Sequence, residues 1–212
     1  MHAQFDYLKN TVSVYNDYYQ AFKNYKVTAE VYDLNSKKVW SKSQQIDIPE
    51  DGVVNDIFTI DFPANITQVH FIKLCLYDDK KKEIANTFYW RSNDKYEGSK
   101  TLTGPTSSGF EDLSKLKQVQ LKTQYKVYQE NGRHFIKAEI KNTSSTLAFF
   151  TQLQLLDENR MPVRPSFYAD NFFSLLPGES KSIVIETAMS DMPAKPIFVV
   201  KGWNVKPKEF KL

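Results

Sequence analysis

Residues 121–140 read LKTQYKVYQENGRHFIKAEI. Apolar and polar side chains alternate along this stretch on both sides of the dipeptide Asn131-Gly132. A period of two residues is typical of a β-strand with one buried side and one side facing water. Asn-Gly favours a tight type I′ turn, because both of its residues accept a positive φ. The stretch therefore predicts an antiparallel β-hairpin.

The same alternation recurs in other parts of the chain, notably over residues 26–32 and 58–62. Compact turn signals such as Asp33-Leu34-Asn35-Ser36 and Asp157-Glu158-Asn159 separate these runs. We count about seven strand candidates in residues 4–92 and about six or seven in residues 118–206. Short strands at such close spacing predict an all-β protein built from β-sandwiches.

Residues 93–117 differ in composition from the rest of the chain. They hold three of the seven glycines, together with Pro105 and several Ser and Thr residues. Within them only Asp112 to Leu116 fits a short helical turn. We therefore predict a linker at residues 96–117 between a first sandwich at 1–95 and a second at 118–212.

The two halves share a plan. In each, a strand ends at an asparagine, a loop follows, and the next strand ends at an aspartate before a turn. These positions are Asn16 and Asp33 in the first half and Asn142 and Asp157 in the second. The identities are too few to establish a duplication, but they fit two sandwiches of the same type.

Composition narrows the classes of function. One cysteine excludes an internal disulfide and a cysteine-built zinc site, and three scattered histidines give no reason to expect a metal or another cofactor. A net charge of +3 is mild for 212 residues, so nucleic acid is not an expected partner. No apolar run reaches the roughly 18 residues of a membrane span. The residues after Met1 have a strand pattern rather than that of a signal peptide.

The sequence contains no recognisable catalytic constellation. It lacks the nucleophile elbow, the P-loop, the dinucleotide fingerprint and the zinc-protease motif, and its carboxylates lie mostly in turns. Cys75 is expected to be a small buried apolar residue. Tyr18 and Tyr19 fall in a predicted loop and are candidates for stacking on sugar rings. The three tryptophans are expected on strands with their side chains in the core: Trp40, Trp90 and Trp203.

The second half carries a specific resemblance. Its motifs are Asn142-Thr143-Ser144, Leu155-Leu156-Asp157, the run from Tyr168 through Leu175-Leu176-Pro177-Gly178-Glu179, and Gly202-Trp203-Asn204. This series resembles the last immunoglobulin-like domain of the β-mannosidases and exo-β-D-glucosaminidases of glycoside hydrolase family 2. The first half, with Val12 to Asn16 and Asn86 to Trp90, is similar to the preceding immunoglobulin-like domain of those enzymes.

The resemblance implies two tandem immunoglobulin-like sandwiches that form the C-terminal part of a longer hydrolase. The catalytic glutamates of that family lie on a (β/α)₈ barrel, for which this chain has neither the length nor the pattern. The chain alone is therefore not expected to be an enzyme, and no catalytic residue is carried over. Its implied partner is that barrel, and the implied location is the periplasm or the extracellular space. The candidates for contact with the barrel or for the rim of its pocket are Tyr168, Asp170, Asn171 and Phe172.

Two other readings remain open from the residues alone. The chain is also interpretable as a pair of carbohydrate-binding modules that bind an oligo- or polysaccharide on their own through Tyr18 and Tyr19. A third interpretation is an adhesion or spacer protein without any affinity for sugars. The sequence does not identify the sugar, because specificity in this family depends on barrel residues.

Overall fold

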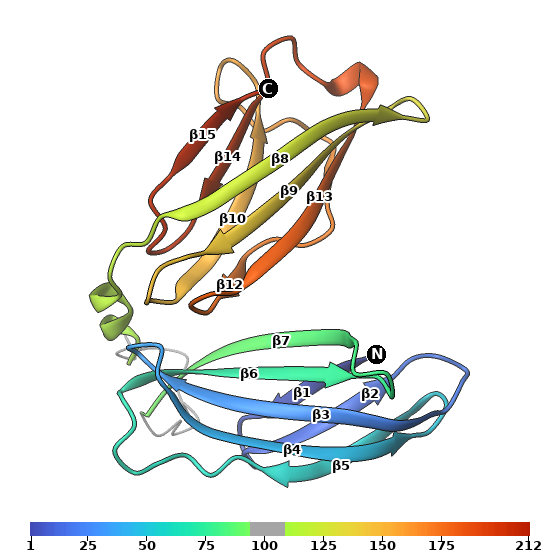
Figure 1. The fold of residues 1–212 in the computed structure, drawn as a ribbon, viewed down its shortest axis with the longest axis vertical. Coiled ribbons are helices and arrows are strands. Elements are labelled where there is room, and N and C mark those ends of the chain that lie inside the picture. Colours follow the sequence, from blue (N-terminus) through green and yellow to red (C-terminus); the bar gives the residue numbers. More distant parts are fainter. Residues whose placement is uncertain (94–108) are drawn as a thin grey trace, which may run out of the picture. The chain divides into compact units, whose positions relative to one another are not determined.

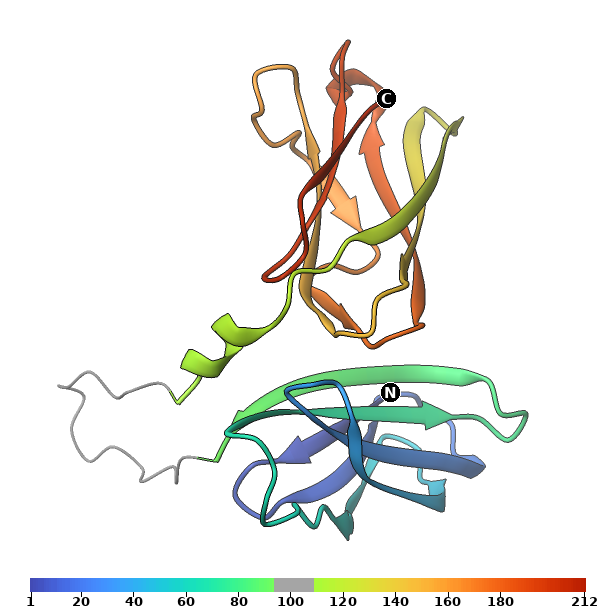
Figure 2. The ribbon, with the colours of Figure 1, turned by 60° about the vertical axis from the view of Figure 1, so that its left-hand side comes forward.

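The computed structural model describes residues 1–93 and 109–212, so residues 96–108 of the expected linker lie outside it. The chain divides into two compact units, Met1–Lys115 and Leu116–Leu212, which we call the first and second domains. Each is a pair of facing antiparallel sheets (Figures 1 and 2). The prediction of two all-β sandwiches is confirmed. In the described residues, no helix has the length and apolarity needed to cross a bilayer.

The first domain contains a three-stranded sheet in the order β1-β2-β5 and a four-stranded sheet in the order β4-β3-β6-β7. Its strands are β1 His2–Asp6, β2 Thr11–Asn16, β3 Phe22–Asp33, β4 Lys38–Ile48, β5 Gly52–Thr59, β6 Val69–Tyr77 and β7 Glu83–Ser92. Apolar side chains at alternate positions of both sheets meet in one buried cluster that includes Val12, Val27, Ala29, Ile72 and Leu74. This is the arrangement that the alternation in residues 26–32 predicts.

The second domain pairs a sheet in the order β12-β10-β14-β15 with a sheet in the order β11-β13-β9-β8. Its strands are β8 Leu121–Glu130, β9 Arg133–Asn142, β10 Ala148–Leu156, β11 Ser166–Tyr168, β12 Phe173–Leu175, β13 Ser180–Ala188, β14 Ile197–Lys201 and β15 Lys208–Lys211. Two short 3₁₀ helices complete the described elements, η1 Glu111–Lys115 and η2 Met189–Asp191. The first of them corresponds to the helical turn expected at Asp112 to Leu116.

The hairpin of residues 121–140 forms as predicted. Strands β8 and β9 pair in antiparallel register from Leu121 opposite Asn142 to Glu130 opposite Arg133. The turn residues Asn131 and Gly132 have φ values of 48° and 73°, as a type I′ turn requires. Sequence pattern and turn chemistry thus agree at this point of the fold.

The tryptophan predictions are partly wrong. Trp40 does pack against the first core, but Trp90 on β7 is exposed. Trp203 is 61% exposed and lies outside the strands, because β14 ends at Lys201. The last strand, β15, also falls outside the range in which strands were counted. Its four residues, KEFK, are too few and too polar to form a visible alternation.

The asparagines that end β2 and β9 make the same three hydrogen bonds, and both are buried. Each side-chain oxygen accepts from the backbone N–H two residues on, at 3.1 Å for Asn16 and 3.0 Å for Asn142. Each side-chain nitrogen donates to the carbonyl four residues on, at 2.8 Å. It also donates to the carbonyl 33 residues on, at 2.7 Å to Pro49 and 2.8 Å to Leu175. The plan seen in the sequence thus has a structural counterpart.

Candidate functional site

The segment from Tyr168 to Phe172 joins β11 to β12. The Tyr168 ring packs against the second core, and its hydroxyl accepts a hydrogen bond from the Leu155 N–H at 2.9 Å. Burial raises the pKa of the Tyr168 hydroxyl above its ordinary value. The side chain therefore holds the segment against β10, and its polar end is occupied within the domain.

Asp170 and Asn171 also form contacts inside the second domain. Asp170 forms an ion pair with Lys181 and accepts from the Asn171 N–H at 2.7 Å. The Asn171 side chain bonds both backbone groups of Leu153, accepting from its N–H at 2.8 Å and donating to its carbonyl at 3.0 Å. It thereby substitutes for a neighbouring strand beside β10. These two residues position the end of the segment.

Phe172 follows at once and points outward. It is 49% exposed and has a φ of 57°, in the left-handed region. Its ring lies 5.3 Å from that of Phe150, which is 37% exposed and has a φ of 53°. Phe150 lies where the register between β10 and β12 shifts, in a β-bulge between Ala148 and Thr151. A bulge of this kind turns a side chain that would otherwise follow the pleat.

Trp203 is tied to the same bulge through the backbone. Its N–H donates to the Phe149 carbonyl at 3.0 Å. A Cβ on the neighbouring Gly202 would lie 3.1 Å from the carbonyl oxygens of Phe149 and Phe150, so this close approach of two backbones needs a glycine. We call the three outward aromatics at this end of the second domain the aromatic end patch: Phe150, Phe172 and Trp203.

The backbone is strained at two residues of the aromatic end patch, Phe150 and Phe172. A left-handed conformation costs an aromatic residue about 1–2 kcal/mol, because its Cβ crowds the following carbonyl. Such strain persists where the surrounding structure enforces it, and it is concentrated at functional sites. The hydrogen bonds of Asn171 and the bulge in β10 are what enforce it here. The arrangement presents large apolar rings in a fixed orientation, which suits contact with a protein surface or a sugar ring.

Sequence reasoning found Phe172 but missed Phe150 and Trp203. The available signal was the pair Phe149-Phe150, two large aromatics in succession within an alternating strand. Phe149 is buried and Phe150 points outward, so the pair marks the bulge. For Trp203 the available signal was the preceding Gly202. The sequence alone does not show whether this glycine lies within a strand or at the close contact with the bulge that it makes here.

The other predicted pair lies in the first domain, in the loop between β2 and β3. Tyr19 is 88% exposed, and Tyr18 is exposed with its ring edge-on to Phe22 at 6.1 Å. The carbonyl of Tyr18 accepts from the Asp51 N–H at 2.9 Å, so the backbone of the loop is anchored. Tyr18 and Tyr19 therefore offer aromatic faces on a held loop.

The remaining titratable groups give no catalytic arrangement in the described residues. Asp33, Asp78 and Asp157 each accept from backbone N–H groups of their own turns. No group of three or more metal-ligating side chains occurs in residues 1–93 and 109–212. Cys75 is buried as predicted, and burial raises the pKa of its thiol to about 11, which makes it a poor nucleophile at neutral pH.

These features define a class of protein: tandem β-sandwiches with exposed aromatic side chains at bulges and loops. Comparison with known proteins gives the family. Residues 9–96 match the mannosidase Ig/CBM-like domain, and residues 101–205 match the exo-β-D-glucosaminidase Ig-fold domain. The chain therefore consists of two immunoglobulin-fold domains of the exo-β-D-glucosaminidase and mannosidase group of glycoside hydrolase family 2, as the resemblance implied.

Curated relatives support the assignment. The chain is 26% identical over 216 residues to an exo-β-D-glucosaminidase of Amycolatopsis orientalis, covering 96% of this chain and 21% of the relative. It is 25% identical to an exo-β-D-glucosaminidase of Hypocrea jecorina, covering 100% of this chain and 24% of the relative. The chain thus spans between a fifth and a quarter of the length of these relatives.

Solved structures show the same fold. The exo-chitosanase of Amycolatopsis orientalis matches with a TM-score of 0.87 and 22% identity, over 100% of this chain and 26% of that one. A β-D-mannosidase of Dictyoglomus thermophilum matches with a TM-score of 0.56 and 18% identity, over 92% of this chain and 20% of that one. Both of these proteins are longer than the part that this chain resembles.

Proposed function

We propose that the chain is a non-catalytic accessory part of a family 2 exo-glycosidase of the β-mannosidase or exo-β-D-glucosaminidase type. It docks on the catalytic barrel of the parent enzyme and rims the barrel's pocket. The observation that carries this proposal is the match of nearly the whole chain to a fifth or a quarter of each relative. The remaining length of such a relative is enough for a barrel of about 250 residues.

The aromatic end patch is the docking surface that we propose. Exposed aromatic residues dominate the energetics of protein interfaces when they are rigid and can be fully desolvated on contact. Phe150 and Phe172 meet the first condition, since backbone conformation and ring contact fix both. Asp170 and Asn171 act on the docking indirectly, by holding Phe172 in place.

The experiment compares hydrolysis of aryl β-D-glucosaminides and β-mannosides by the 212-residue chain and by the full-length product of the parent gene. We expect turnover only by the parent. In the parent, Phe172→Ala and Trp203→Ala should raise KM or lower the thermal midpoint. The control Phe167→Ala removes an exposed ring from β11, outside the patch, and should do neither. Turnover by the 212-residue chain alone would overturn the proposal.

A second candidate function rests on Tyr18 and Tyr19. In this alternative the chain is an independent pair of carbohydrate-binding modules, and the two tyrosines stack on sugar rings. Binding of the isolated chain to insoluble mannan or chitosan, lost in Tyr18→Ala and Tyr19→Ala, would favour it over docking. Binding that survives both substitutions, or no binding, leaves the accessory role as the better account.

We further propose that the parent protein is exported to the periplasm or beyond the cell. The support is the family membership, because the resemblance implies an exported enzyme, located in Gram-negative bacteria in the periplasm. Fractionation of cells that express the parent gene, with detection by an antibody against this chain, tests the proposal. Recovery of all of the protein in the cytoplasmic fraction would contradict the proposal.

A further inference from the structure

The outer face of the β8–β9 hairpin carries an unusual row of cross-strand pairs. Lys122 lies directly opposite Lys141, and Lys126 lies directly opposite Lys137. Between these two lysine pairs, Gln124 faces Glu139. All six side chains are on the solvent side of the sheet and exposed. Two like-charged pairs therefore occupy the same face of one hairpin, about 14 Å apart along the strands.

This arrangement is unfavourable for the hairpin itself. Directly opposite side chains have Cβ atoms about 5 Å apart, and like charges at that distance destabilise the pairing. Within the described parts of the chain, none of the four lysines forms an ion pair. Arg133, at the far end of the same hairpin, does form one with Glu186. The hairpin thus pairs its positive charge at the turn, while at the two lysine pairs four ammonium groups share the face with the single carboxylate of Glu139.

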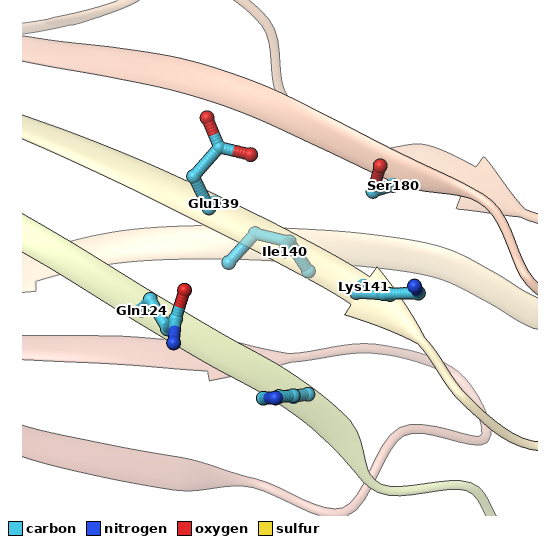
Figure 3. A pocket seen from close by; sticks show the side chains of 6 residues that line it. Gln124, Glu139, Ile140, Lys141 and Ser180 are labelled. Atoms are coloured by element: carbon cyan, nitrogen blue, oxygen red, sulfur yellow. The ribbon is translucent and has the colours of Figure 1, made fainter.

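A hollow lies at the first of these pairs. It has a volume of about 280 Å³ and is lined by Lys122, Gln124, Glu139, Ile140, Lys141 and Ser180. Figure 3 shows Gln124 on β8, Glu139 and Lys141 on β9, and Ser180 on the adjacent β13. The lining therefore combines ammonium groups with an amide, a hydroxyl and one carboxylate. Ammonium groups attract anions, and the other three groups exchange hydrogen bonds with hydroxyls.

The row continues with an aromatic pair. Tyr128 lies opposite Phe135, two residues along the strands from Lys126 and Lys137 and on the same face, and the two rings stack at 5.0 Å. From Lys122 to Tyr128 the strand advances about 20 Å. Along this length the face presents positive charge, hydrogen-bonding groups, positive charge again, and an apolar edge. An extended chain with repeated negative charges and many hydroxyls matches that sequence of groups.

We infer that the outer face of β8, β9 and β13 binds an acidic polysaccharide, with carboxylates of the glycan at the two lysine pairs and its hydroxyls at Gln124, Glu139 and Ser180. A protein partner fits less well, because lysine is depleted in protein interfaces and four lysines dominate this face. The site is independent of the proposed docking surface. It also excludes a polymer of glucosamine, whose ammonium groups the lysines would repel.

The test uses the 212-residue chain and alginate, a polyuronate, with binding measured by calorimetry at low ionic strength. The double variant Lys122→Gln/Lys141→Gln removes the pair at the hollow. We expect its affinity for alginate to fall about tenfold or more, since two close charge contacts are lost. The matched control, Lys195→Gln/Lys206→Gln, removes the same charge from exposed lysines elsewhere in the second domain and should retain wild-type affinity.

Thermal unfolding separates a binding defect from a folding defect. Because the replaced lysines repel each other, the double variant should unfold at the same temperature as the wild type or above it. A variant that binds alginate weakly while melting no earlier supports the proposal. The proposal is overturned if alginate does not bind, if the control weakens binding equally, or if poly-glutamate binds as tightly as alginate.

Discussion

The two domains differ in whether aromatic residues adopt left-handed backbone. In the described part of the first domain the non-glycine residues with a positive φ are Ser36, Lys81 and four Asn or Asp residues: Asn10, Asn24, Asp51 and Asp56. Asparagine and aspartate tolerate this conformation, because their short side chains bond to nearby backbone. In the second domain the corresponding irregularities include Phe150 and Phe172, which gain no such bond. In the described residues, left-handed backbone at exposed aromatic rings therefore occurs in the second domain and not in the first.

The two domains share the polar contacts that hold the sandwich together. Asn16 and Asn142 make the same three hydrogen bonds at the end of equivalent strands. Asp33 and Asp157 each close a turn by accepting from the N–H four residues on, at 2.8 Å. The comparison teaches that shared polar anchors define the sandwich, while the departures from them are candidates for function.

The largest expected effect tests the shared anchor. Asn142→Ala leaves two carbonyls and one N–H without their partner in the second domain, and Asn16→Ala does the same in the first. Each should lower the free energy of unfolding of its own domain by about 3–5 kcal/mol. Amide hydrogen exchange, resolved by domain, measures this difference.

The turns supply matched controls for the anchor variants. Asn35 and Asn159 lie at the same position of the Asp33 and Asp157 turns, and both are exposed. Asn35→Ala and Asn159→Ala should each change stability by less than about 0.5 kcal/mol. If one anchor variant costs as little as its control, the two asparagines do not serve the same purpose.

The next largest effect is a loss of stability at acid pH, which we expect in the first domain. His70 is buried at 1% exposure beside the Phe62 ring, with Nδ1 3.4 Å from the Thr67 carbonyl and the charge of Arg91 nearby. Burial, together with the nearby Arg91 charge, lowers the pKa of His70 from 6.5 to about 4, although hydrogen bonds to the backbone at Thr67 and Gln68 act to raise it. In the unfolded chain the imidazole takes up its proton near pH 6.5, so only the unfolded state is protonated between pH 6.5 and 4.

The free energy of unfolding of the first domain should therefore be highest above pH 6.5, with respect to His70, and should fall as the pH drops toward 4. The shift corresponds to about 3 kcal/mol. Urea titrations at several pH values, followed through the reactivity of the buried Cys75 thiol, measure it in the first domain alone. His70→Asn should abolish this dependence. The second domain does not contain His70 and serves as the internal control. A slope that persists in His70→Asn would assign the effect to other groups.

The comparison also explains what the sequence could predict. Strand alternation, the Asn131-Gly132 turn and the Asn and Asp positions are local signals, so the sandwiches and their shared plan were predictable from single stretches of chain. The outward turn of Phe150 depends on pairing with β12, and that of Trp203 on the contact of Gly202 with the bulge. Such contacts join residues more than 20 positions apart, and periodicity carries no information about them.

A reciprocal exchange of residues tests the difference in strain. Asn24→Phe places an aromatic at an exposed left-handed position of β3 and should cost the first domain about 1–2 kcal/mol. Phe172→Asn should stabilise the second domain by about 0.5–1 kcal/mol, since relief of strain outweighs the loss of one half-exposed ring contact. Asn24→Gly is the control and should be nearly neutral. If Phe172→Asn destabilises the domain, the ring contact contributes more than the backbone strain.

The smallest effect compares one ion pair from each domain. Burial acts to raise the pKa of Glu30, but hydrogen bonds from Lys38 at 2.8 Å and Tyr32 at 2.5 Å outweigh it and hold the pKa below its ordinary value. The hydrogen bonds of Arg160 likewise lower the pKa of Glu209, but that pair is exposed, at 2.6 and 3.0 Å. Water and salt screen an exposed pair far more than a half-buried one.

We therefore expect Glu30→Gln to cost the first domain about 0.5–1 kcal/mol near neutral pH. The cost should disappear as the pH falls through the lowered pKa of Glu30, because the wild-type carboxylate is then protonated too. Glu209→Gln should not measurably change the unfolding of the second domain in moderate salt. Thermal melts of both variants at low and high salt decide the matter. A larger loss for Glu209→Gln would mean that the paired geometry of an arginine fork outweighs partial burial.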